Sequence, residues 1–333
     1  MNFAKNTFAL MIDYMLILKG IAMGTANVIP GVSGGTIALI TNIYERFINA
    51  LKNINFTAIK LLFTGKIKEL ISYIDLYFLL QVFTGVLIAF FTIAFLLKYL
   101  FLHYPIYTWA FFFGLIIGSS WLIIKKLNKM TLWDWVLLLI GISIPVIMVF
   151  LKPINENDNL FYILFCGIIG TSGMVLPGIS GSYLILLLGN YKLIMLDAVT
   201  TLNLRILIPF LIGSILGLII VSYFISLLLK KYYNQVLSLL AGFVIGSLAL
   251  IWPWKYSIDF THGLLLQNKF GALIDANGQL INFKPYIIKY QYFLPEIDTQ
   301  FWISILLIII GIIIVVGTEI LSVQIVRKRQ KKN

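Results

Sequence analysis

Charged residues are scarce in this chain. Asp, Glu, Lys and Arg make up 11% of its 333 residues, and hydrophobic residues make up 60%. Soluble domains carry about a quarter charged residues. This shortage excludes an ordinary soluble domain and predicts a polytopic membrane protein, a single integral membrane domain over residues 1–333.

Cysteine and histidine are nearly absent. The one cysteine, Cys166, excludes an intramolecular disulfide and a cysteine-rich metal site. The two histidines, His103 and His262, have neither metal-ligand spacing nor a nucleophile beside them. Nucleotide-loop, hydrolase and metalloprotease motifs are missing as well. We therefore expect no enzyme, no metal and no cofactor, and we leave open a coupling ion, either a proton or sodium.

Acidic residues are outnumbered, with 13 against 25 basic ones, and the formal net charge is +12. The basic residues cluster between apolar segments, as the positive-inside rule describes. No recognition motif accompanies the charge, so we do not expect nucleic-acid binding. The clusters place both termini in the cytoplasm. The sequence leaves the oligomeric state open.

Long apolar runs are what the chain has in abundance. They lie at about 8–28, 34–51, 76–102, 106–124, 132–151, 160–176, 181–196, 204–229, 235–252 and 300–324. Runs of about 20 residues are long enough to cross a bilayer. Residues 52–75 mix lysines with apolar residues, which predicts an amphipathic helix on the cytoplasmic surface.

One short phrase occurs twice inside these runs, as IPGVSGG at 29–35 and LPGISGS at 176–182. Pro removes a backbone donor and Gly weakens a helix. In hydrocarbon every backbone polar group needs a partner, so broken helices occur only where they are buried in protein or line a cavity. The phrases predict two re-entrant helical hairpins.

Other small residues extend the duplication. Gly85, Gly114, Gly118 and Ser119 recur 128 positions later, as Gly213, Gly242, Gly246 and Ser247. Repeat one is thus 8–125 and repeat two 160–252. The helix 132–151 connects them, and an external loop 253–299, a final helix 300–324 and a basic cytoplasmic tail 325–333 follow. The single connecting crossing inverts repeat two relative to repeat one. The predicted fold is all-α, an inverted repeat with two re-entrant hairpins and about six full transmembrane helices.

Each break also suits an anion. A helix start presents unpaired N–H groups and partial positive charge, and hydroxyls add donors. We assign to a phosphate site Asn27, Pro30, Gly31, Ser33, Gly34, Gly35, Thr36, Pro177, Gly178, Ser180, Gly181 and Ser182. Glu45, Arg46 and Arg205 are possible charge partners. The alternative for the breaks is a tight turn with close packing, and for the charged residues a place at the membrane interface.

The run from Gly24 to Ile40, continuing from Ile43 to Arg46, closely resembles the signature of the bacterial polyprenyl-phosphate transporter family (PopT), formerly a domain of unknown function. Residues 176–182 and 188–191 match its second signature. The resemblance covers roughly residues 15–325. Family members often carry an acidic residue where this chain has Asn27, so this chain has no carboxylate at that position to couple protons.

The resemblance implies a multi-pass protein of the bacterial cytoplasmic membrane. It implies a flippase that moves undecaprenyl phosphate, a membrane lipid, from the outer to the inner leaflet, recycling the carrier lipid of envelope polymer synthesis. The residues alone also allow a small-anion channel or exchanger using the same paired helix starts. An enzyme that processes lipid phosphates would need a Lys/Arg and His constellation that the chain does not contain.

Overall fold

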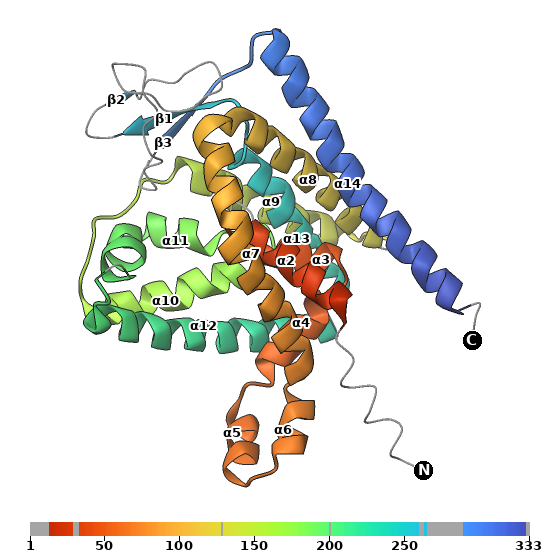
Figure 1. The fold of residues 1–333 in the computed structure, drawn as a ribbon, viewed down its shortest axis with the longest axis vertical. Helices are drawn as coiled ribbons and strands as arrows, with labels where there is room; N and C mark the ends of the chain where they lie inside the picture. Colours follow the sequence, from red (N-terminus) through yellow and green to blue (C-terminus); the bar gives the residue numbers. More distant parts are fainter. Residues whose placement is uncertain are drawn as a thin grey trace. The chain divides into compact units, whose positions relative to one another are not determined.

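The computed structural model describes residues 13–28, 33–127, 129–199, 201–259, 263–264 and 289–330 (Figure 1). Helices dominate this part of the chain, as the composition predicted. The first seven are α2 (Tyr14–Val28), α3 (Gly34–Ile40), α4 (Tyr44–Lys52), α5 (Phe56–Phe63), α6 (Ile67–Tyr73), α7 (Leu76–His103) and α8 (Pro105–Lys126). The later ones are α9 (Leu132–Phe150), α10 (Leu160–Val175), α11 (Gly181–Leu187), α12 (Leu204–Lys231), α13 (Tyr233–Gly246) and α14 (Thr299–Gln330).

Two short helices of other types and a small sheet complete the described chain. A π-helix, η2, covers Lys192–Ala198, and a 3-10 turn, η3, covers Ser247–Ala249. Strands β1 (Lys255–Asp259), β2 (Gly263–Leu264) and β3 (Lys289–Tyr292) form a small antiparallel sheet in the order β2-β1-β3. The expected external loop 253–299 therefore contains some strand. The hairpin turn that Asn277-Gly278 suggests lies outside the described residues.

Local sequence signals explain several helix ends. Thr131 and Asp134 form a capping box at the start of α9, and Asn159 accepts hydrogen bonds from the first N–H groups of α10. Pro105 opens α8, where the missing N–H has no cost. Pairs of lysines close α8 and α12, where a cation complements the negative end of the helix dipole.

Four helices in the described part of the chain are long and apolar enough to cross a bilayer: α8, α9, α12 and residues Thr299–Gly317 of α14. The pair formed by α6 and Leu76–Ala89 of α7, bent by 61°, is a fifth candidate. Leu160–Val175 and Tyr233–Ala249 are shorter apolar helices. These findings agree with a polytopic all-α membrane protein, and the count of six full crossings stays a prediction.

The chain divides into two compact units. The first contains residues 1–95, 157–185 and 197–233, and the second contains 96–156, 186–196 and 234–333. In the first unit α10 and α12 lie side by side, and α4 packs on α12 (Figure 1). In the second unit α14 lies along α8.

Helix boundaries recur at the two offsets noted in the sequence. Helix α2 ends at Val28 and α10 at Val175, while α3 and α11 have the same length and begin at Gly34 and Gly181. These boundaries differ by 147 residues. Helices α7 and α12 match at both ends with an offset of 128, and α8 and α13 begin at that same offset.

Equivalent glycines make equivalent close contacts in the first unit. A Cβ added to Gly85 of α7 would collide with the carbonyl oxygen of Ile17 on α2. A Cβ added to Gly213 of α12 would collide in the same way with Leu164 on α10. The two pairs of helices therefore cross at matching positions, with their backbones in direct contact.

The second unit contains a similar pair of crossings. Gly114 on α8 meets the backbone of Ile308 on α14, and Gly242 on α13 meets the backbone of Leu138 on α9. Because Gly114 and Gly242 are equivalent under the 128-residue offset, α14 and α9 occupy equivalent places beside α8 and α13. The duplicated pattern of contacts thus extends to α9 and α14.

The segment between α4 and α7 has no counterpart before α12. It was expected to be one amphipathic helix, but it forms two short helices, α5 and α6, joined at Thr64–Lys66. Gly65 has a φ of 70°, a left-handed conformation that reverses the chain and that glycine adopts without strain. The two helices lie side by side as a hairpin (Figure 1).

Candidate functional site

The second break is a tight turn between α10 and α11. The N–H of Ile179 donates to the carbonyl of Leu176, with Pro177 and Gly178 in the middle of the turn. Gly178 has a φ of 78°. Pro followed by a residue of positive φ is the signature of a type II turn, which explains the need for a Pro-Gly pair here. Pro177, Gly178 and Ser180 are buried.

The first break ends at the start of α3. Ser33 is the N-cap, and its hydroxyl accepts a hydrogen bond from the N–H of Gly35 at 3.1 Å. The side-chain oxygen of Asn27, near the end of α2, accepts from the N–H of Gly34 at 2.7 Å. The predicted site residues Pro30 and Gly31 lie outside the described residues.

The two breaks contact each other. The hydroxyl of Ser33 donates toward the carbonyl oxygens of Met174 and Leu176, at 3.1 and 3.0 Å. The hydroxyl oxygen of Thr36 accepts from the N–H of Gly178 at 2.9 Å. These bonds satisfy carbonyls and an N–H group that the broken α10 leaves without helical partners.

Glycine is required at the contact itself. A Cβ on Gly35 would stand 2.5 Å from the carbonyl oxygen of Val175, so a side chain there would force the two breaks apart. Both Ser33 and Thr36 are almost fully buried. The site is therefore a buried polar junction in which the segments around 33–36 and 174–178 interlock.

On the other side of the second break, the hydroxyls of Ser180 and Ser182 lie 3.0 Å apart. Gly181 is held against the carbonyl oxygen of Gly170, where no larger residue fits. The structure thus places Ser180, Gly181 and Ser182 at the start of α11, as the sequence predicted. Both α3 and α11 have only seven residues, about two turns. For anion binding at these helix starts, the hydroxyls and individual N–H groups therefore matter more than a helix dipole.

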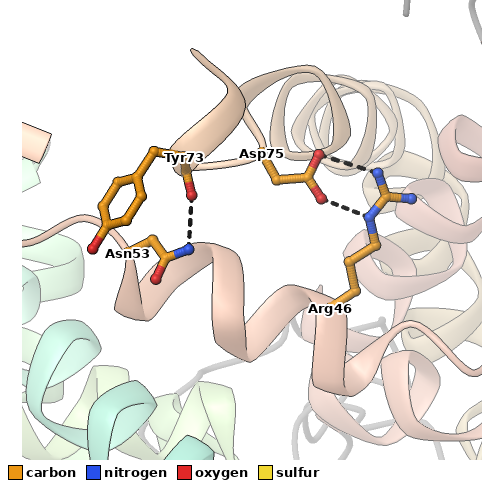
Figure 2. Close-up of polar contacts among 4 residues, drawn as sticks. All are labelled: Arg46, Asn53, Tyr73 and Asp75. Atoms are coloured by element: carbon orange, nitrogen blue, oxygen red, sulfur yellow. Dashed lines mark hydrogen bonds and ion pairs between the residues drawn. The ribbon is translucent and has the colours of Figure 1, made fainter. Parts of the chain in front are cut away.

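The expected charge partners lie elsewhere in the first unit. Arg46 on α4 makes a bidentate ion pair with Asp75, at 2.6 and 3.1 Å (Figure 2). Its guanidinium also stands over the ring of Phe78. Glu45 and Arg205 are exposed. A role for them in binding phosphate stays a prediction.

Sequence reasoning missed a polar group in the first hairpin. The ammonium of Lys19 on α2 donates to the carbonyl of Thr41, 2.8 Å away, at the C-terminal end of α3. The interruption of an apolar helix by a lysine was the available signal, because such a cation needs a polar partner in the membrane. Lys19 thus ties the far end of α3 to α2.

Comparison with known proteins identifies the family of this chain. Residues 23–264 match the family described as undecaprenyl phosphate translocase-like. The chain is 33% identical over 307 residues to a polyprenyl-phosphate transporter of Vibrio cholerae serotype O1, covering 91% of this chain and 94% of that protein.

A polyprenyl-phosphate transporter of Staphylococcus aureus is 34% identical over 254 residues, covering 71% of this chain and 85% of that protein. No solved structure matches. The family match spans most of the chain and includes both breaks. This multi-pass membrane protein belongs to the undecaprenyl phosphate translocase-like family.

Proposed function

We propose that this protein translocates undecaprenyl phosphate from the outer to the inner leaflet of the bacterial cytoplasmic membrane. The family and the names of two relatives support a polyprenyl phosphate as substrate and a transporter rather than an enzyme. The observation that carries the site is the junction of the two breaks, where the hydroxyls of Ser33 and Thr36 bind the backbone of 174–178.

The chemical problem is the phosphate. The tail is as apolar as the lipid around it, but an anionic head group crossing about 30 Å of hydrocarbon needs donors throughout its path. In the junction the N–H of Gly34 is bonded to Asn27 and that of Gly35 to Ser33. Phosphate binding then exchanges one set of hydrogen bonds for another, so no donor is left bare in the membrane.

Our proposed site comprises the breaks and their hydroxyls. Ser33 and Thr36 face the second break, and Ser180 and Ser182 stand beside it. When the two hairpins separate, Ser33 and Thr36 lose their partners and become free to bind a phosphate oxygen. Asn27 and the glycines at 34, 35, 178 and 181 shape the backbone around the site, with Pro177. Pro30 and Gly31, which lie outside the described residues, remain part of the proposed site.

The proposed transport cycle rests on an inverted repeat. The matching helix boundaries and glycine contacts support a duplication, and the equivalence of α9 and α14 gives each repeat three helices after its hairpin. An odd number of crossings inverts the second copy relative to the first. Both termini are then cytoplasmic, and alternating exposure follows from exchanging the conformations of the two copies. Coupling to a proton or sodium gradient is an open part of this proposal.

Leaflet transfer of a fluorescent short-chain polyprenyl phosphate in liposomes tests the proposal. Ser33→Ala combined with Ser180→Ala should reduce transfer about tenfold or more, because hydrogen bonds to a charged group are worth about 1.5–3 kcal/mol each. Ser143→Ala is the matched control, since that exposed hydroxyl bonds only within α9. Normal transfer by the folded double variant contradicts the site. Flux of inorganic anions without lipid transfer favours the anion-channel alternative.

A further inference from the structure

The α5–α6 hairpin buries very little of its own surface. Helix α5 has one buried residue, Ala58, and α6 has none. Phe56 and Phe63 are 80% and 85% exposed. Isolated helices of fewer than about 12–15 residues are marginal in water, so helices of eight and seven residues need packing from another source.

The root of the hairpin is fixed firmly to the first unit. The amide of Asn53 donates to the carbonyl of Tyr73 at 2.7 Å, and the ion pair of Arg46 with Asp75 holds the bend between α6 and α7 (Figure 2). Asn55 caps α5 and its amide reaches the hydroxyl of Tyr73 at 3.1 Å. The position of the hairpin relative to α7 is therefore defined.

The sequence around the bend indicates the edge of the bilayer for this position. The apolar helix α7 begins at Leu76, directly after the bend. The hairpin is too short to span hydrocarbon, yet its surface is strongly apolar. The large exposed side chains are Phe56, Ile59, Leu62, Phe63 and Ile67. A surface of this kind is stable in the interfacial layer, where apolar groups enter the acyl region and the backbone stays near water.

The charges of the hairpin have one dominant sign. Lys60, Lys66 and Lys68 are exposed, with Glu69 as the only acidic residue between Phe56 and Tyr73. Glu69 forms an exposed pair with Lys66 at 3.2 Å, and both side chains are more than half accessible. Such a pair contributes little and leaves the positive excess intact.

We propose that the α5–α6 hairpin is a binding surface for anionic phospholipid head groups. Its phenylalanines and aliphatic residues enter the interface, and its lysines gather anionic lipids around the first hairpin of the protein. The hairpin lies in the segment without a counterpart in the second half of the chain, so the surface is on one leaflet only. This inference does not depend on which substrate the protein carries.

Selective contact with anionic lipid is measurable in the full-length protein. An environment-sensitive fluorophore is attached to Thr64→Cys, at the turn of the hairpin, in a Cys166→Ala background. The protein is reconstituted with equal mole fractions of brominated phosphatidylglycerol or brominated phosphatidylcholine in otherwise identical vesicles. We expect the anionic lipid to quench the fluorophore at least about twofold more, and the difference to shrink in roughly 0.5 M salt.

Two sets of variants separate charge from insertion. Replacing Lys60, Lys66 and Lys68 by Gln should bring the quenching ratio close to one, while the same change at Lys129, Lys230 and Lys231 should leave it unchanged. Phe56→Ser with Phe63→Ser should reduce quenching by both lipids. Equal quenching in the unaltered hairpin, or a fluorophore fully accessible to aqueous iodide, overturns the proposal without any variant.

Discussion

The hydroxyl oxygen of Thr36 accepts a hydrogen bond from the backbone N–H of Gly178, 2.9 Å away, although the two residues are 142 positions apart. The bond joins the start of α3 to the turn that ends α10. Ser33 makes the complementary connection to the carbonyls of Met174 and Leu176. Side chains of the first break thus satisfy backbone groups of the second, which permits an interrupted helix inside an apolar protein.

Removing the Thr36 hydroxyl should loosen this junction. Thr36→Val keeps the shape and leaves the buried N–H of Gly178 without its acceptor, at a cost of about 1–3 kcal/mol. We expect a lower midpoint of thermal unfolding in detergent. Thr25→Val is the matched control, because the Thr25 hydroxyl bonds only to Ile21 in its own helix. Equal midpoints for the two variants would contradict the role of the bond.

The amide of Asn27 should be replaceable by another acceptor but not by an apolar group. Asn27→Leu removes the acceptor of the Gly34 N–H, and we expect a loss of about 1–3 kcal/mol. Asn27→Asp keeps an oxygen in the same place and should retain most of the stability. The thermal unfolding midpoints of both variants test this expectation. An Asn27→Leu protein as stable as the unaltered one would count against a stabilising role for the bond between Asn27 and Gly34.

Adding a methyl group at the helix crossings should destabilise the first unit. Gly213→Ala places a Cβ against the backbone of Leu164, and Gly85→Ala does the same against Ile17, so we expect about 1–3 kcal/mol of destabilisation for each. Gly317→Ala is the control, since a Cβ there meets nothing within 4 Å. The control should be neutral or slightly stabilising because alanine favours a helix.

Variants of the Arg46–Asp75 pair can distinguish a role of Arg46 in phosphate binding from a structural role at the bend between α6 and α7. Both side chains are partly exposed, so breaking the pair should change stability by no more than about 1 kcal/mol. If Arg46 is the charge partner that the sequence suggests, Arg46→Gln should weaken phosphate transfer and Asp75→Asn should leave it intact. If both variants transfer phosphate equally, Arg46 serves only to hold the bend between α6 and α7.

Lys255, in β1 of the second unit, should make stability depend on pH. It is buried, donates to the carbonyl of Leu250 at 2.7 Å and lies over the ring of Trp109. Burial lowers the pKa of Lys255 to about 7 from 10.5. Between these two values the unfolded chain holds a proton that the folded protein lacks, so stability should rise with pH across that window. Lys255→Met should flatten the rise of the thermal unfolding midpoint with pH, measured from roughly 6.5 to roughly 9.5.

The sequence by itself determined the class of protein and the location of its irregular segments. Few charges and long apolar runs define a membrane protein, because burying charge in hydrocarbon is expensive. The two Pro-Gly phrases identify the breaks, since their effect on a helix is local. The offsets of 147 and 128 residues identified equivalent positions. The ends of α2 and α10, at Val28 and Val175, agree with the first offset, and the ends of α7 and α12 agree with the second.

Only the tertiary structure decided the partners of those positions. Nothing in local spacing indicates that Ser33 binds the carbonyl of Leu176, that Lys19 binds the carbonyl of Thr41, or that α9 and α14 occupy equivalent places. The surface segment was expected as one helix, and the reversal at Gly65 divides it into two. Composition and periodicity indicate which solvent a residue prefers and whether it fits its own helix. A hydrogen bond across more than 140 residues depends instead on how the whole chain packs.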